Sequence, residues 1–188
     1  MVNRRKIREA IGWTHQTALA DPSAWRKAAS DFHEAAVVLY KHEGHFTLVF
    51  AFNAGLSLEL ALKAILAARG TKVPATHKIR ELAAIARINI EKEQVDTLDI
   101  FTSIVEWRGR YPAPTKESKW NDFHDIDMER VTIRKQDGNV HKTMADPKRF
   151  PTLENYIKLW ETCDTEFRKV APYAGFHGRS STKPNSVR

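Results

Sequence analysis

The chain has 188 residues, a length typical of one domain, and its 30 Lys and Arg against 23 Asp and Glu give a net charge of +7. The whole excess lies in residues 1–8 and 174–188, so the basic balance defines no binding face on the neutral remainder. A hydrophobic fraction of 42% makes a disordered chain unexpected, and no charge-free apolar run reaches the roughly 18 residues of a membrane span. The single cysteine, Cys163, excludes an intrachain disulfide, and a start without an apolar leader favours a cytoplasmic location.

The first two predicted helices have strong end signals. Asp21 and Pro22 are a cap residue followed by proline at the first helical position, and Gly44 marks the end of that helix. The second helix covers about residues 45–69 and ends at Gly70. Apolar residues occupy several faces of this second segment, which predicts the most buried helix of a bundle.

Three more helices are expected. Thr76 caps the third, the fourth covers about residues 91–110 before Pro112, and the fifth covers about residues 151–170. The expected fold is all-α, an up-and-down bundle of about five helices over residues 21–173. A basic N-terminal segment (residues 1–20) precedes it, and a flexible basic tail (residues 174–188) follows it.

Residues 112–149 do not fit a helical pattern and form a predicted insertion between the fourth and fifth helices. Asp137-Gly138 is a strong hairpin signal with alternating flanks, so we expect a small β-hairpin laid on the helices. A two-residue turn there places Arg134 directly opposite His141, with Cβ atoms about 5 Å apart. The acidic residues just before the hairpin are interpreted as a solvated loop, and no metal site is predicted; they are Asp122, Asp125, Asp127 and Glu129.

Several short motifs, taken in order, resemble the HEPN family (higher eukaryotes and prokaryotes nucleotide-binding). They cover about residues 22–112 and, more loosely, 150–172. The motifs are Trp25-x3-Ala29-x-Asp31-Phe32, Glu59 before Ala61-Leu62-Lys63-Ala64, Arg69-Gly70, Pro74-x2-His77 and Arg110-Tyr111-Pro112. The resemblance implies a helical bundle that dimerises through its long helices. It also implies roles related to nucleic acids. Many members are metal-independent ribonucleases, including toxins paired with small nucleotidyltransferases, and others are inactive binding or scaffold modules.

The active branch of the family carries Arg-x(4–6)-His at the end of the fourth helix. Here Arg108 and Arg110 are followed by Tyr111-Pro112 and no histidine within reach, so the chain resembles the branch described as nucleotide-binding. The ribonuclease chemistry usual in the family is therefore not expected, a metal-independent ribonuclease stays the alternative, and neither a cofactor nor a metal is predicted.

The predicted ligand-binding residues are Arg108, Arg110, Tyr111, Glu59, Lys63 and His77. Arginine forks match phosphate and an aromatic ring can stack on a base, although cations also favour a helix C-terminus without any ligand. Glu59 and Lys63, four residues apart, are interpreted as an internal polar pair, with catalysis as the alternative. His77 is interpreted as a packing or capping residue, with a base as the alternative.

Three functions are compatible with the sequence. The first is a nucleotide- or RNA-binding module, within a prokaryotic toxin–antitoxin or defence system and with a nucleotidyltransferase partner protein. The second is a metal-independent ribonuclease in which Arg134 and His141 hold the phosphate. The alternative for these two residues is an exposed polar pair without a catalytic role. The third is a helical adaptor for a protein partner. A homodimer is expected in each case.

Overall fold

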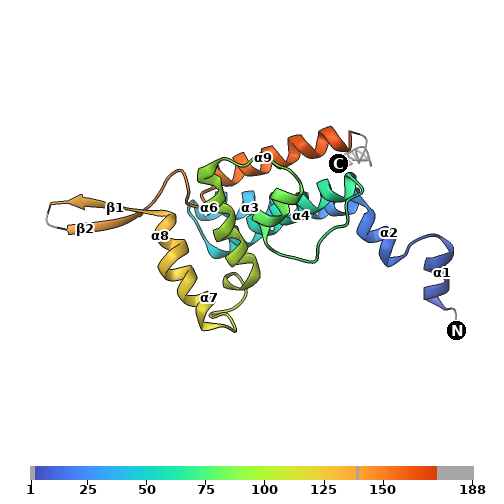
Figure 1. Cartoon of the computed structure of the whole chain (residues 1–188), viewed down its shortest axis with the longest axis horizontal. Coiled ribbons are helices and arrows are strands. Elements are labelled where there is room, and N and C mark those ends of the chain that lie inside the picture. Colours follow the sequence, from blue (N-terminus) through green and yellow to red (C-terminus); the bar gives the residue numbers. More distant parts are fainter. Residues whose placement is uncertain (1–2, 139, 173–188) are drawn as a thin grey trace, which may run out of the picture.

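The computed structural model describes residues 3–138 and 140–172, so the predicted tail over residues 174–188 lies outside the described part (Figure 1). Asp21 caps the first bundle helix by accepting a hydrogen bond from the Ser23 backbone N–H, and Gly44 ends it in the left-handed conformation. The predicted all-α bundle with a hairpin between its fourth and fifth helices is confirmed. Its helices are α3 (Pro22–Glu43), α4 (Leu48–Ala68), α5 (Ile79–Ile85), α6 (Lys92–Ser103) and α9 (Leu153–Val170).

Helix α4 lies at the centre of the bundle, as its apolar composition predicts. It packs against α3, α5, α6 and α9, and its side chains Phe50, Leu58, Leu62 and Ile65 are fully buried. By length and composition α4 is apolar enough to cross a membrane, but 67% of its most apolar window is buried inside the bundle. That burial is the pattern of a core helix.

Two glycines allow α6 and the segment after it to approach α4 closely. A Cβ atom on Gly55 would lie 2.8 Å from Val105 Cγ2, and one on Gly109 would lie 2.7 Å from Phe52 Cδ2. Between these contacts the chain widens into a π-helical segment, η1 (Ile104–Arg108). The close packing fixes where the residues after Gly109 leave the bundle.

The insertion is partly helical, so the prediction of a non-helical segment over residues 112–149 is wrong. Residues 117–130 form α7 (Glu117–Asn121), the π-helical segment η2 (Asp122–Asp127) and α8 (Met128–Arg130). The buried Phe123 packs edge-on against Trp107 of η1, with ring centroids 5.5 Å apart. The acidic residues read as a loop therefore lie on a helix held by tertiary packing, which local patterns do not report.

The predicted hairpin is present, with a different register. Strands β1 (Thr132–Asp137) and β2 (Val140–Ala145) pair antiparallel, with Asp137 opposite Val140. Gly138 takes the positive φ of the turn (+60°), so the turn lies one residue later than predicted. The pairing shifts by two residues, and Arg134 lies opposite Thr143 while His141 lies opposite Gln136. Because the shift is even, the predicted division of side chains between two faces is retained.

The hairpin is not laid on the helices, and that prediction is also wrong. It projects away from the bundle, on the side opposite the N-terminal segment (Figure 1). Val140 is 59% exposed and Met144 48% exposed, whereas Val131 just before β1 is fully buried. The strands carry too few apolar side chains to anchor them, so burial stops at the hairpin base.

The basic N-terminal segment contains two short helices, α1 (Arg4–Ala10) and α2 (His15–Ala20), neither of which has a buried residue. Asn3 and Thr14 cap them through their side chains. Ile11 and Trp13 between them are 70% and 63% exposed. The segment leads away from the bundle (Figure 1).

A buried polar network joins α3, α4 and α9. The Tyr156 hydroxyl lies 2.7 Å from both His33 Nδ1 and Ser57 Oγ, and the His33 ring stacks on Trp160. Burial lowers the pKa of His33 from its ordinary value of 6.5. One turn further along α9, burial raises the pKa of the Cys163 thiol to about 12. Ser57, Tyr156 and Cys163 are buried in the core, and His33 lies partly buried at its edge.

Candidate functional site

A buried ion pair lies on the face of α4 that meets α3 and the segment before α5. Lys63 Nζ donates to Glu59 Oε1 at 2.6 Å, and the two residues are only 7% and 2% exposed. The Lys63 ammonium also lies 5.6 Å from the centroid of the Trp25 ring, within the range of a cation–π contact. The predicted internal pair is therefore present and is deeply buried.

His77 extends this pair toward the surface. Its Nδ1 lies 3.0 Å from Glu59 Oε2, while its side chain is 53% exposed. Because a carboxylate only accepts hydrogen bonds, Nδ1 carries the proton in this contact and Nε2 is left for another partner. Three of the predicted ligand-binding residues, Glu59, Lys63 and His77, thus form one cluster with a half-exposed imidazole at its outer end.

Arg108, Arg110 and Tyr111 form a second group where η1 ends. Arg110 Nη2 donates to the backbone oxygen of Glu106 at 2.8 Å, and its Cζ lies 5.6 Å from the centroid of the Tyr111 ring. Tyr111 is 55% exposed. Arg108 Cζ lies 5.9 Å from the Trp107 ring. An exposed guanidinium beside an exposed phenol ring can fork onto a phosphate while the ring stacks on a base.

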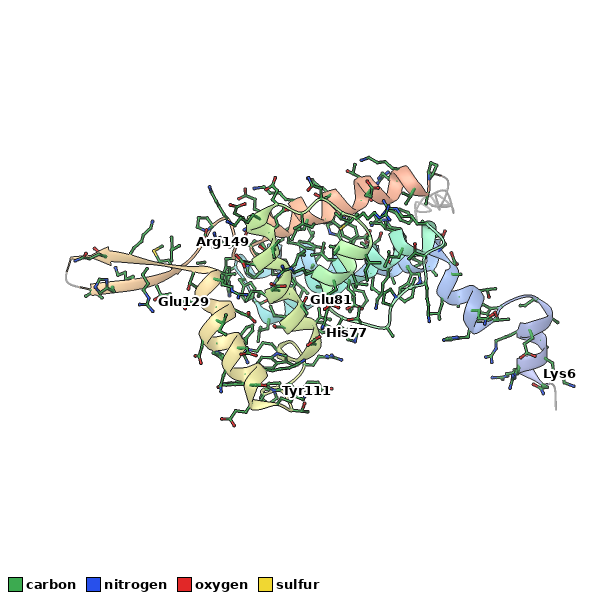
Figure 2. All side chains as sticks on the ribbon, viewed as in Figure 1. Lys6, His77, Glu81, Tyr111, Glu129 and Arg149 are labelled. Carbon is green, nitrogen blue, oxygen red and sulfur yellow. The ribbon has the colours of Figure 1, made fainter. Side chains whose placement is uncertain are left out.

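The two groups lie on the same side of α4. Gly109 packs against Phe52 and His77 contacts Glu59, and these α4 residues are seven positions apart on one helical stripe. Seven residues span two turns, or about 10 Å along the axis. The labelled His77 and Tyr111 both lie along the lower edge of the bundle in Figure 2. The structure therefore gathers the six predicted residues into two clusters, and no hydrogen bond or ion pair joins them.

A cleft that no sequence pattern indicates adjoins this edge, between α5, α6, η1 and η2. Its volume is about 740 Å³. Its charges are largely paired, through Lys78 with Glu81, Arg80 with Asp99, Lys119 with Glu106, and Arg130 with Asp127. Burial raises the pKa of Asp99 and of Asp127. The helical fold of residues 117–130 creates this cleft, and no local signal predicts it.

The predicted catalytic pair on the hairpin lacks its predicted geometry. Arg134 and His141 share a face but are diagonal neighbours, which are about 7–8 Å apart in antiparallel sheets. The prediction of direct opposition is wrong because the strands pair two residues out of the expected register. Among residues 3–138 and 140–172, no group of three or more His, Cys, Asp or Glu side chains could hold a metal ion.

The fold and these clusters define an all-α module with an exposed arginine–tyrosine pair and a buried glutamate–lysine pair behind a histidine. A family model described as HEPN domain matches residues 22–131, more than half of the chain. The chain therefore belongs to the HEPN family, which relates it to nucleotide- and RNA-associated modules. No curated protein and no solved structure matches the chain.

Proposed function

We propose that this HEPN domain binds a nucleotide or single-stranded RNA through Arg108, Arg110 and Tyr111. The observation that carries the proposal is the exposed Arg110–Tyr111 pair, whose guanidinium is held by the Glu106 carbonyl oxygen. The guanidinium contacts a phosphate, and the phenol ring stacks on the attached base.

The histidine cluster supplies the second half of the proposed site. His77 Nε2 accepts a hydrogen bond from a ribose hydroxyl or base edge, while Glu59 holds the imidazole in place. The α4 residues that the two clusters contact, Phe52 and Glu59, are about 10 Å apart along the helix axis, which suits a ligand longer than one mononucleotide, since single-stranded binding sites cover several nucleotides. RNA is therefore the favoured ligand within the proposal.

Fluorescence anisotropy with labelled single-stranded RNA tests the proposal. We expect Arg110→Ala and Tyr111→Ala each to weaken binding about tenfold, the loss typical of a stacked base. Arg168→Ala, which also removes one exposed guanidinium but lies on α9, is the matched control and is expected to change affinity less than about twofold. A loss for Arg168→Ala as large as that for Arg110→Ala would show that only net charge matters and would contradict the site, as would unchanged affinity in Tyr111→Ala.

We also propose that the domain is a homodimer built through α3 and α4, which expose Val38, Leu48 and Val49. Light scattering is expected to show a dimer for the native chain and a monomer for Val38→Glu combined with Val49→Glu. A native monomer at every concentration contradicts the proposal.

We further propose that the domain acts in the cytoplasm as part of a toxin–antitoxin or defence system. Failure to co-purify with a nucleotidyltransferase encoded by a neighbouring gene counts against this role.

A further inference from the structure

The β1–β2 hairpin stands apart from the bundle with both faces in solvent. Every described side chain over residues 134–145 is exposed, and the contact with the bundle runs through α8 at the hairpin base (Figures 1 and 2). An isolated two-stranded hairpin gains little stability from its own contacts. The hairpin therefore adds little to the bundle, and its side chains are available to a partner.

The two faces of the hairpin differ in chemistry. One face, called the polar face below, has hydrogen-bonding side chains and no carboxylate. The other face mixes apolar residues with charges, including an ion pair between Lys142 and Asp137. The polar face consists of Thr132, Arg134, Gln136, His141 and Thr143, with Ala145 at its base.

Arg134 and His141 are the strongest hydrogen-bond donors of the polar face. Neither Arg134 nor His141 makes a hydrogen bond or ion pair with any other residue in the described ranges 3–138 and 140–172. Five arginines on the helices or at the hairpin base pair with carboxylates, namely Arg26, Arg69, Arg80, Arg149 and Arg168. Arg134 shares its lack of a carboxylate partner within the described ranges with Arg87, Arg108 and Arg110. An exposed, unpaired guanidinium on a face without acids attracts an anionic ligand.

The shape of the hairpin selects among polyanions. Six-residue strands are about 20 Å long and lie about 4.8 Å apart. The major groove of B-form DNA is about 12 Å wide and admits a two-stranded ribbon of this kind. The major groove of duplex RNA is too narrow and deep for side chains to read, so RNA duplexes are a poor match.

We propose that the hairpin binds double-stranded DNA, with its polar face in the major groove. Arg134 forks onto the O6 and N7 acceptors of guanine, and Gln136 pairs with the N6 and N7 edge of adenine. Lys135 on the other face and Lys148 after β2 contact the flanking phosphates. Charge complementarity supports this occupant, because Arg134, Lys135 and Lys148 have no carboxylate partner in the described part of the chain, whereas Arg130, Lys142 and Arg149 are paired. The inference goes beyond the proposed function, since it uses a different surface and ligand.

Anisotropy of the full chain with a labelled duplex of about two helical turns tests the inference, beside an RNA duplex of the same sequence. We expect Arg134→Ala to weaken DNA binding about tenfold or more by removing a base contact. Lys135→Ala is the matched control, because it removes the same charge from the opposite face. We expect it to weaken DNA binding less than Arg134→Ala does, and to reduce the slope of log affinity against log salt concentration by about 1. The RNA duplex is expected to bind at least about tenfold more weakly than the DNA duplex.

Several outcomes would overturn the inference: no binding of duplex DNA, equal affinity for duplex RNA, or equal losses from Arg134→Ala and Lys135→Ala. So would a hairpin-dependent dimer without DNA binding, revealed when Val140→Ser combined with Met144→Ser abolishes self-association. Thermal unfolding of each variant controls for folding. Arg110→Ala, which tests the RNA site, is expected to leave duplex DNA binding unchanged, so the two proposals fail separately.

Discussion

The bundle and the hairpin use polar residues in opposite ways. In the bundle, Glu59 and Lys63 are paired with each other, and Tyr156 is shared between two partners inside the core. In the hairpin, Arg134 and His141 face solvent without a described partner. Buried polar groups must be paired, because an unpaired one costs free energy, and they therefore help to fix one arrangement of helices. Exposed unpaired groups contribute little to stability and are free for ligands.

The largest expected effect is at the buried ion pair. Glu59→Ala leaves the Lys63 ammonium buried without its carboxylate, and we expect it to lower the free energy of unfolding by about 3–5 kcal/mol. Urea unfolding measures the loss. Replacing both residues, by Glu59→Leu with Lys63→Met, is expected to recover much of it, because no unpaired charge remains. If Glu59→Ala unfolds at the same midpoint urea concentration as the native protein, the ion pair is not buried as described.

A second effect is expected where α6 and η1 meet α4. Gly55→Ala introduces a Cβ atom 2.8 Å from Val105 Cγ2, and this overpacking is expected to cost about 1–3 kcal/mol of unfolding free energy. Adding Val105→Ala removes the clashing methyl group. Gly55→Ala should therefore lower the free energy of unfolding less in the Val105→Ala protein than in the native protein. Identical losses would show that this contact does not set the separation of the helices.

A smaller effect is expected from pH. Because burial lowers the pKa of His33, helped by Arg26 and opposed by Glu34 and Asp164, the unfolded chain takes up a proton more readily than the native one. The free energy of unfolding is therefore expected to decrease as pH falls below about 6.5. His33→Phe keeps a ring against Trp160 and should flatten that slope in unfolding curves collected across this range. An unchanged slope would assign the pH dependence to other groups.

The smallest effect is expected on the hairpin. Arg134→Ala and His141→Ala remove exposed side chains and are expected to change the unfolding free energy by less than about 0.5 kcal/mol each. Calorimetry of the two variants checks this expectation. A loss as large as that of Gly55→Ala would mean that the hairpin is packed in solution, and the contrast between the two regions would disappear.

The sequence predicts the bundle well because its helix ends carry local signals. Asp21, Pro22 and Gly44 act on their own neighbours, so their effect is readable without a structure. The helix over residues 117–130 was missed because its order depends on Phe123 packing against Trp107, a contact between distant segments. The cleft beside it could not be predicted for the same reason.

The sequence predicts which residues form the candidate site, but it does not predict how they are arranged in space. Spacing alone placed Glu59 and Lys63 on one helix face, and the contact between Glu59 and His77 required the fold. On the hairpin, the dipeptide Asp137-Gly138 predicts a turn at both residues, whereas Asp137 pairs with Val140 in the ladder and the turn begins at Gly138. A local motif fixes the presence of a turn more firmly than its register.

The burial of Cys163 has a practical consequence. It is the only cysteine in the sequence, it is 2% exposed, and its raised thiol pKa leaves almost no reactive thiolate at neutral pH. A maleimide dye added to the folded protein should therefore leave it unmodified. A new cysteine on the hairpin, such as Lys142→Cys, can then be labelled selectively in the otherwise native chain, and the dye would report directly on contact between hairpin and ligand.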